Sequence, residues 1–223
     1  QHGLPLLDAL CSALIVRGLR TLGCTLESGQ QLEADALRVQ LGILPAHERL
    51  LRRMLEILAE DGVLRRDDVG WLVVAAPQDE SPEALAAALL ARAPGMRNET
   101  TLTLRCGLAL PDVLRGAADP LELLFPGGST DEAAALYAES PSFRVFNALV
   151  RDTVAEALAA AGHGPFRVLE VGGGTGGVTR ELLPVLPADR VHYDFTDVSP
   201  LFTARATELF GDHAGFRAAV LDL

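Results

Sequence analysis

The clearest hydrophobic pattern lies in the last third of the chain, where short apolar runs alternate with segments of helical periodicity. We predict strands at residues 166–171, 191–197 and 216–222, and helices at residues 175–186 and 200–210. Strands that alternate with helices form parallel β-α-β units in an open sheet. The first run, FRVLEV, is read as a strand buried on both faces. Right-handed crossovers then place the carboxyl ends of the three strands at one edge, where ligands bind in such folds.

The first third of the chain shows helical periodicity and then two short apolar runs around a turn. We predict helices at residues 4–23, about 30–41 and about 45–61, and a hairpin within residues 63–74. This is the order of a winged-helix module, which often binds DNA. The third helix carries the basic residues Arg49, Arg52 and Arg53 together with the acidic residues Glu48, Glu56, Glu60 and Asp61. Because the two charges offset each other, we interpret this helix as having a solvated face and reject DNA binding.

The middle of the chain is less regular. A proline-rich break spans residues 77–100, contains a predicted helix at about 81–93, and is the expected boundary between submodules. Residues 101–130 show weaker periodicity, and short and long helices are predicted near 131–138 and 142–161. The long helix is expected to present one apolar face made of Phe146, Leu149, Val150, Val154, Ala157 and Leu158.

Composition excludes several classes of protein. Of the 223 residues, 49% are hydrophobic, which is ample for a packed core. No apolar run approaches the roughly 18 residues of a membrane span, so we expect no membrane partner. The net charge of −11 argues against nucleic acid as a partner. Cys11, Cys24 and Cys106 are odd in number and widely spaced, so we expect three buried, reduced thiols in a cytoplasmic protein and no metal site.

A glycine-rich turn follows the first predicted strand of the last third. It contains Gly172, Gly173, Gly174, Gly176 and Gly177. Glycine accepts the positive φ that such turns require and leaves the backbone open to close approach by a ligand. By itself the turn is a weak signal, because a tight strand-to-helix connection also uses glycine.

Two acidic residues strengthen the case for a ligand. Asp197 ends the second predicted strand, about twenty residues past the turn, where a carboxylate accepts both hydroxyls of a ribose. Asp222 ends the third predicted strand, where it could meet an adenine amino group. Taken singly, each is an ordinary exposed residue at a strand end. Together with the turn they predict an adenosine-containing ligand.

The glycine spacing alone leaves that ligand open. The turn satisfies both GxGxxG, the dinucleotide fingerprint, and GxGxG, which is common in methyltransferases. Glu170, two residues before the first glycine, favours one of them. A carboxylate there repels a pyrophosphate but suits the cationic amino-sulfonium end of S-adenosyl-L-methionine (SAM). We therefore favour SAM and keep a nicotinamide dinucleotide as the alternative.

Several of these segments resemble one known family. Residues 168–177 (VLEVGGGTGG), 195–202 (FTDVSPLF) and 220–222 (VLD) closely resemble the SAM-binding core of the C-methyltransferase domains of polyketide synthases. Upstream, residues 119–128 and 136–141, with Phe146 and Asn147, are similar to the lid of those domains. The resemblance covers nearly the whole chain, although the match before residue 77 is generic.

The resemblance implies methyl transfer from SAM to the α-carbon of a β-ketoacyl chain on an acyl carrier protein, with neighbouring synthase domains as further partners. The glycines and Glu170 would hold the methionine part, Asp197 the ribose and Asp222 the adenine. Tyr137 and Asn147 would lie near the cofactor from the lid side. The structural alternative for these two is a packed aromatic ring and a helix cap.

The resemblance assigns deprotonation of the α-carbon to a His with a carboxylate partner beyond the third strand, a region past Leu223. No residue of this chain is assigned a catalytic role, and His163, His192 and His213 are interpreted as structural. A catalytically inactive pseudo-methyltransferase that packs within a synthase is therefore a second hypothesis. A small-molecule O-methyltransferase with a winged-helix dimerisation domain is a third.

The expected fold class is α/β. We predict a helical, winged-helix-like subdomain at residues 1–77, a helical lid and connector at 78–161, and the first half of a Rossmann-like SAM-binding sheet at 162–223. A parallel sheet of three strands would leave residues 166–171 without a neighbour on their other side.

Overall fold

A computed structural model describes residues 3–222. The chain forms two compact units, Gln1–Gly128 and Ser129–Leu223, called here the amino-terminal and carboxy-terminal units. The mixed α/β class agrees with the sequence prediction. The three-part division at residues 77 and 161 stays a prediction. Within residues 3–222 no helix combines the length and apolarity needed to cross a membrane.

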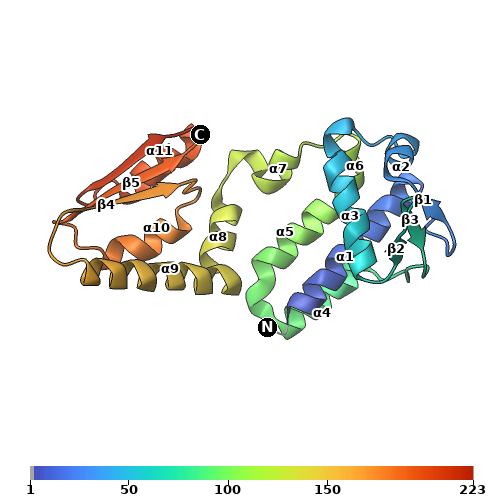
Figure 1. Cartoon of the computed structure of the whole chain (residues 1–223), viewed down its shortest axis with the longest axis horizontal. Coiled ribbons are helices and arrows are strands. Elements are labelled where there is room, and N and C mark those ends of the chain that lie inside the picture. The colour runs from blue at the N-terminus through green and yellow to red at the C-terminus, as the bar shows by residue number, and fades with distance from the viewer. Residues whose placement is uncertain (1–2, 223) are drawn as a thin grey trace. The chain divides into compact units, whose positions relative to one another are not determined.

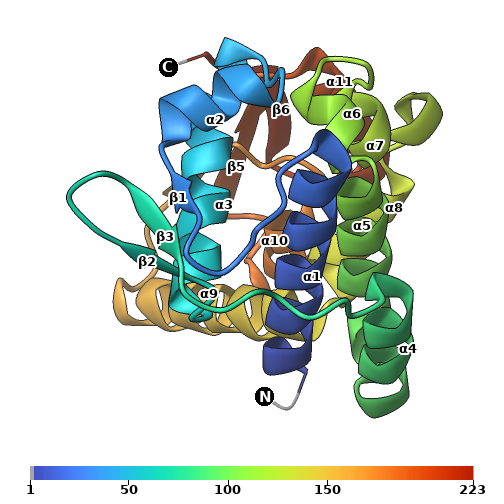
Figure 2. The same cartoon turned by 90° about the vertical axis from the view of Figure 1, so that its right-hand side faces the viewer.

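The amino-terminal unit begins with the winged-helix order that the sequence predicted. Its helices are α1 (Leu4–Leu22), α2 (Ala34–Gln40) and α3 (Glu48–Glu60), the last preceded by a 3-10 turn at Pro45–His47. The hairpin consists of β2 (Leu64–Arg66) and β3 (Trp71–Val73), and its loop extends past the helices (Figure 2). The expected helix start near residue 30 is wrong. Residues 31–32 form β1 (Gln31–Leu32), which pairs with β3, because main-chain pairing at the sheet edge overrides local helix periodicity.

The charged face of α3 is a set of exposed ion pairs. Arg52 contacts Glu48 at 3.2 Å and Asp35 at 2.6 Å, and Arg53 contacts Glu60 at 2.7 Å. The opposite face is apolar and packs into the core of the unit, where Leu51, Met54, Leu55 and Leu58 are at most 2% exposed. This division of the helix into a paired charged face and a buried apolar face is what the charge pattern predicted.

The remainder of the amino-terminal unit is more helical than its weak periodicity suggested. Its elements are α4 (Pro82–Arg92), α5 (Arg97–Leu108), α6 (Leu110–Leu114) and α7 (Pro120–Leu124), with 3-10 turns at Pro94–Met96 and Pro126–Gly128. Helices α1, α4 and α5 lie side by side (Figures 1 and 2). Gly107 on α5 makes this close approach possible, because a Cβ there would lie 2.5 Å from Cδ1 of the buried Leu14. The packing partner, not the local sequence, therefore decides that this segment is helical.

The thiols do not all fit the sequence expectation. Cys24 is buried, but Cys11 and Cys106 are only half-buried, and all three are free. The expectation of three buried thiols was therefore wrong for two of them. Cys11 lies on α1 and Cys106 on α5, and helical periodicity alone does not distinguish full from partial burial.

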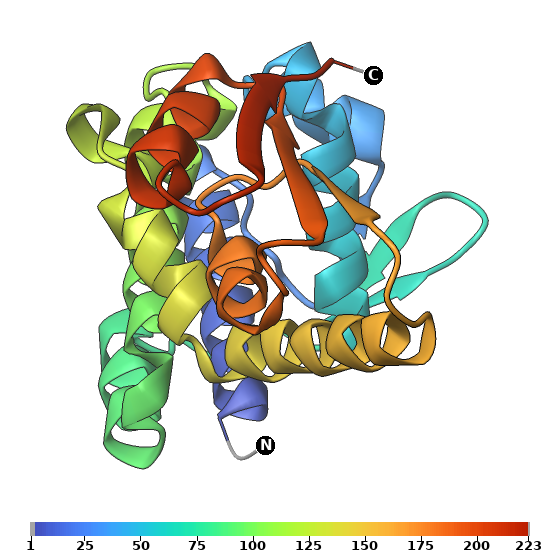
Figure 3. The same cartoon turned by 90° about the vertical axis from the view of Figure 1, so that its left-hand side faces the viewer.

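The carboxy-terminal unit is a three-stranded parallel sheet with helices on one face (Figures 1 and 3). The strands lie in the order β4 (Phe166–Val171), β5 (Val191–Asp197) and β6 (Phe216–Val220). Helix α8 (Asp131–Glu139) and α9 (Pro141–Ala160) precede the sheet. Helix α10 (Gly177–Leu182), with a 3-10 turn at Leu183–Val185, and α11 (Pro200–Phe210) connect the strands. The predicted bounds of β4, β5 and α11 are confirmed.

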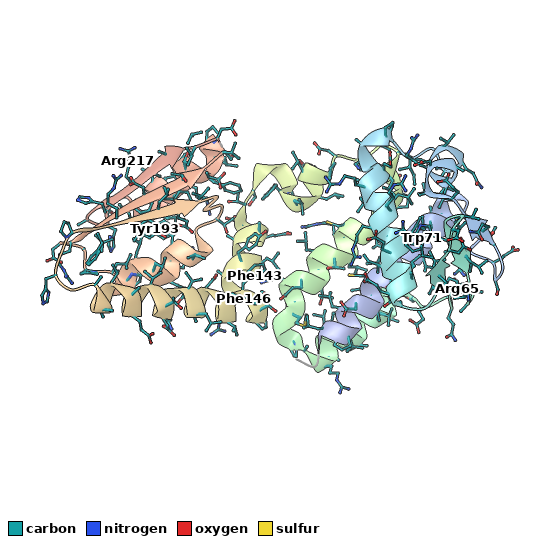
Figure 4. All side chains as sticks on the ribbon, viewed as in Figure 1. Arg65, Trp71, Phe143, Phe146, Tyr193 and Arg217 are labelled. Atoms are coloured by element: carbon teal, nitrogen blue, oxygen red, sulfur yellow. The ribbon has the colours of Figure 1, made fainter. Side chains whose placement is uncertain are left out.

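The core of this unit lies between the sheet and α9, α10 and α11. Tyr193 and Phe195 of β5 are at most 1% exposed and pack with partly buried Val154 and Leu158 of α9. Of the predicted apolar face of α9, only Val154 and Leu158 pack against this core, and Ala157 is exposed. Phe146 is 64% exposed, because it lies before the part of α9 that covers the sheet (Figure 4).

The expectation that residues 166–171 are buried on both faces is wrong. Leu169 is 61% and Val171 54% exposed, whereas the alternate residues of β4 face the core. The reason is that all three packed helices lie on one side of the sheet. The other side carries Arg217, labelled in Figure 4, and Arg167, and each forms an ion pair with Asp194 of the central strand.

The core of the amino-terminal unit gives a stability prediction with a matched control. Leu51 is fully buried, whereas its neighbour Leu50 on α3 is 41% exposed. We expect Leu51→Ala to lower the free energy of unfolding by about 2–5 kcal/mol. Leu50→Ala should lower it by less than about 1 kcal/mol. Denaturant unfolding followed by fluorescence of Trp71, the only tryptophan, measures both. Equal effects of the two variants would contradict the packing described here.

Candidate cofactor-binding site

The glycine turn uses its glycines for two different physical reasons. Gly172, Gly174 and Gly176 have φ of 71°, 55° and 76°, in the left-handed region that side chains rarely adopt. Gly173 is required by packing, since a Cβ there would overlap the ring of the buried Phe195. A Cβ at Gly172 would meet nothing within 4 Å. The turn is therefore fixed from below by the core and open on its outer side.

The end of β5 holds the turn in place. Gly173 N–H donates to the Thr196 carbonyl at 2.9 Å, and the Thr196 hydroxyl donates to the Glu170 carbonyl at 2.7 Å. Parallel pairing sets this geometry, because Val171 lies opposite Thr196 in the register of β4 and β5. The turn and the carboxyl end of the second strand therefore form one hydrogen-bonded edge.

Asp197 is buried at this edge and is oriented by backbone donors. Its Oδ2 accepts from Gly174 N–H at 2.9 Å, and its Oδ1 accepts from Ser199 N–H at 2.8 Å. The residue is 7% exposed. An ionised carboxylate has about four acceptor positions, so each oxygen retains one for a further donor. The structure thus brings Asp197 against the glycine turn, as its position in the sequence predicted.

Glu170 lies on the face of β4 that packs against the helices. Its Oε2 accepts from the Thr179 hydroxyl at 2.5 Å and from the Tyr193 hydroxyl at 2.8 Å. Burial raises the pKa of the Glu170 carboxyl above its ordinary value, and the two hydroxyl donors act against that rise. Glu170 therefore joins β4, α10 and β5 directly beneath the glycine turn.

Asp222 differs from its prediction. Strand β6 ends at Val220, two residues earlier than expected, so Asp222 follows the strand and is exposed. The strand stops because its partner β5 ends at Asp197, which pairs with Val220. One more bond, from Leu221 N–H to the Asp197 carbonyl at 3.0 Å, keeps this segment at the carboxyl edge.

Asn147 and Tyr137 meet next to the glycine turn. The Asn147 amide donates to the Tyr137 carbonyl at 3.1 Å, in the last turn of α8, which is the geometry of a helix cap. The Tyr137 ring packs edge-on against Phe143 with ring centroids 4.7 Å apart. A Cβ at Gly177 would lie 3.2 Å from the Tyr137 carbonyl oxygen. The packed-ring and helix-cap interpretation thus has direct support, and cofactor contact by these two residues stays a prediction.

Two residues of this site were missed by sequence reasoning, Thr179 and Tyr193. A signal for Tyr193 was present, because a tyrosine in an apolar strand must find a partner for its hydroxyl. Tyr193 lies between the sheet and α10 (Figure 4). Which acceptor it meets depends on the strand register, which places Tyr193 opposite Val168, two residues before Glu170 and on the same face of the sheet.

Solved structures share this fold over almost the whole chain. The carbon methyltransferase of CurJ superposes with a TM-score of 0.90 at 35% identity, covering 98% of this chain and 58% of that one. The CMeT domain of the citrinin polyketide synthase gives 0.84 at 29% identity, with 98% and 58% covered. The trans-methyltransferase CalH, solved in complex with SAH, gives 0.56 at 17% identity, which shows the fold alone.

Curated relatives are polyketide synthases. The non-reducing polyketide synthase pigA of Monascus ruber is 33% identical over 99% of this chain, and methylphloroacetophenone synthase of Cladonia uncialis 34% over 96%. The chain spans about 8% of the length of these two relatives. No protein-family profile matches the chain.

The parallel sheet, the glycine turn and the carboxylates at its edge thus define a methyltransferase fold. Within that class the sequence and the superposition agree on one family. The chain belongs with the carbon methyltransferase domains of polyketide synthases, as the motif resemblance predicted.

The contact between Gly173 and Phe195 predicts a local loss of stability. Gly173→Ala forces its Cβ into the Phe195 ring, and we expect overpacking of about 1–3 kcal/mol. Gly164→Ala is the matched control, because a Cβ there meets nothing within 4 Å and its φ is not positive. Hydrogen exchange of the β4 and β5 amides, measured by mass spectrometry, should quicken in Gly173→Ala alone. Unchanged exchange in both variants would contradict this description of the turn.

Proposed function

We propose that this chain forms the SAM-binding part of a polyketide synthase carbon methyltransferase domain. The domain would methylate the α-carbon of a β-ketoacyl chain carried by an acyl carrier protein. The observation that carries the proposal is the hydrogen-bonded edge described above. There Asp197 and Glu170 flank a glycine turn, in a chain 35% identical to a carbon methyltransferase. SAM would supply a methyl group activated by its sulfonium.

The residues present fit SAM in shape and charge. The open outer side of Gly172 and Gly174 leaves the space that close approach of a ligand requires. Glu170 suits the amino-sulfonium end, since a carboxylate attracts a cation and repels a pyrophosphate. Asp197 retains one acceptor position on each oxygen for the two ribose hydroxyls. Asp222, exposed at the same edge, is assigned to the adenine amino group.

The histidines of the chain take no part in the proposed chemistry. The two ring nitrogens of His213 lie 3.1 and 3.0 Å from the carbonyl oxygens of Ala214 and Leu183, which supports a structural role. His163 precedes β4, at the opposite edge of the sheet from the glycine turn. We therefore assign the chain cofactor binding and assign no catalytic base to it.

SAM binding by the full chain is the first test, measured by isothermal titration calorimetry. We expect SAM to bind and NAD not to bind. Asp197→Asn should weaken SAM binding by about 10- to 100-fold, because it removes the charge that accepts the ribose hydroxyls. Asp212→Asn is the control, since Asp212 lies exposed before β6, at the far edge of the sheet. Binding of NAD without SAM would overturn the proposal.

Methyl transfer is the second test and separates an enzyme from an inactive domain. A polypeptide extended past Leu223 is incubated with SAM carrying a labelled methyl group and a β-ketoacyl carrier protein. We expect label on the acyl chain. SAM binding without transfer would indicate the pseudo-methyltransferase, and transfer to a free phenol or alcohol would indicate an O-methyltransferase.

A further inference from the structure

The carboxylate of Glu170 is held by one oxygen only. Both hydroxyl donors, Thr179 and Tyr193, bond to Oε2. Among the described residues Oε1 has no donor, and it is not one of the enclosed polar atoms that lack a partner. A half-buried carboxylate with one oxygen anchored and the other accessible is oriented, because rotation of the carboxyl group would break two hydrogen bonds.

Tyr193 and Thr179 are deeply buried in the core of the unit. Tyr193 is 1% exposed, its ring stacks with Phe216 at 6.0 Å, and Thr179 is fully buried. A phenylalanine and a valine would fill the same spaces without hydroxyl groups. A buried hydroxyl destabilises the fold unless it is hydrogen-bonded, and both of these hydroxyls have Glu170 as acceptor. We therefore attribute the two hydroxyl groups to the orientation of the Glu170 carboxylate.

Among the residues that the structure describes, the groups that shift the pKa of the Glu170 carboxyl include no cation. Burial raises the pKa of the carboxyl, and the two hydroxyls are the groups that lower it. The pKa of Tyr193 is raised by burial and by Glu170, so its hydroxyl stays protonated and remains a donor. The charged groups on the packed elements have other partners or face solvent: Arg151 with Glu181, Arg205 with Asp131, Asp197 with backbone N–H groups, and Arg180 exposed.

We propose that Tyr193 and Thr179 are positioning residues for the amino-acid end of SAM, acting through Glu170. This role rests on the proposed function, and it gives the two oxygens of the Glu170 carboxylate different tasks. The two hydroxyls anchor Oε2 and favour the ionised form, and Oε1 receives the ammonium group. Without the hydroxyls the carboxyl group would turn freely and would keep its proton to higher pH.

The test compares SAM with methylthioadenosine, which has the adenosine and the sulfur but no amino-acid end. Both ligands are titrated calorimetrically into the full chain between about pH 5 and pH 9. The variants are Tyr193→Phe and Thr179→Val, and Thr179→Ser is the control that keeps a hydroxyl. We expect both hydroxyl-free variants to weaken SAM binding about tenfold near neutral pH, with methylthioadenosine unaffected.

The direction of the pH effect depends on which protonation state of Glu170 binds the ammonium group of SAM. Ionised Glu170 attracts the ammonium group, so affinity for SAM rises as pH rises through the pKa of Glu170. Donors to the carboxylate lower that pKa, so their removal moves the midpoint of the rise to higher pH in Tyr193→Phe and Thr179→Val. Thr179→Ser should keep the midpoint of the unaltered chain. A purely structural role of the hydroxyls would not move this midpoint.

The outcomes separate this inference from the proposed function. If the unaltered chain binds no SAM, both are overturned. Two results would overturn the positioning role alone when the unaltered chain binds SAM. In the first, the variants keep the pH midpoint of the unaltered chain. In the second, their affinities for SAM and for methylthioadenosine fall equally. Should Tyr193→Phe unfold, as thermal melting would reveal, Thr179→Val against Thr179→Ser decides the question.

Discussion

Strand β5 is the element on which the carboxy-terminal unit depends, because it is the middle strand of a parallel sheet of three. Its carboxyl end bonds the glycine turn through Thr196 and Asp197. Its Phe195 ring occupies the space beneath the turn, so that residue 173 has room for no side chain. Two residues earlier on the same face of the strand, the Tyr193 hydroxyl donates a hydrogen bond to Glu170. The parallel register with β4 therefore fixes the positions of the core side chains, the glycine turn and the carboxylates together.

The edge of the sheet combines negative charge with neutral donors. Glu170 is bonded by two hydroxyl groups and Asp197 by two backbone N–H groups. Because these hydrogen bonds to the two carboxylates come from neutral groups, they leave the negative charge available to attract a positively charged ligand. The same potential disfavours a pyrophosphate. The electrostatics of the edge thus agree with the family to which sequence and superposition assign the chain.

Much of the fold was predictable where the hydrophobic pattern is strong and the connections are short. The bounds of β4, β5 and α11 and the place of the glycine turn followed from the sequence. The pattern failed where pairing or packing with a distant segment decides the structure. Strand β1 forms only because β3 lies beside it, and α5 is helical against α1, which approaches at Gly107. The end of β6 likewise depends on where its partner strand stops.

The sequence by itself determined that carboxylates and glycines gather at one edge of a parallel sheet, because strand direction and crossover handedness allow little else. The residue types also favoured a cationic nucleoside over a dinucleotide as the ligand of that edge. Only the tertiary structure decided how these groups are held. Register and side-chain packing bring Thr179 and Tyr193 to Glu170, and Asn147 to the Tyr137 carbonyl. They also leave one face of β4 exposed, because contacts between distant residues are set by how the elements pack and not by local periodicity.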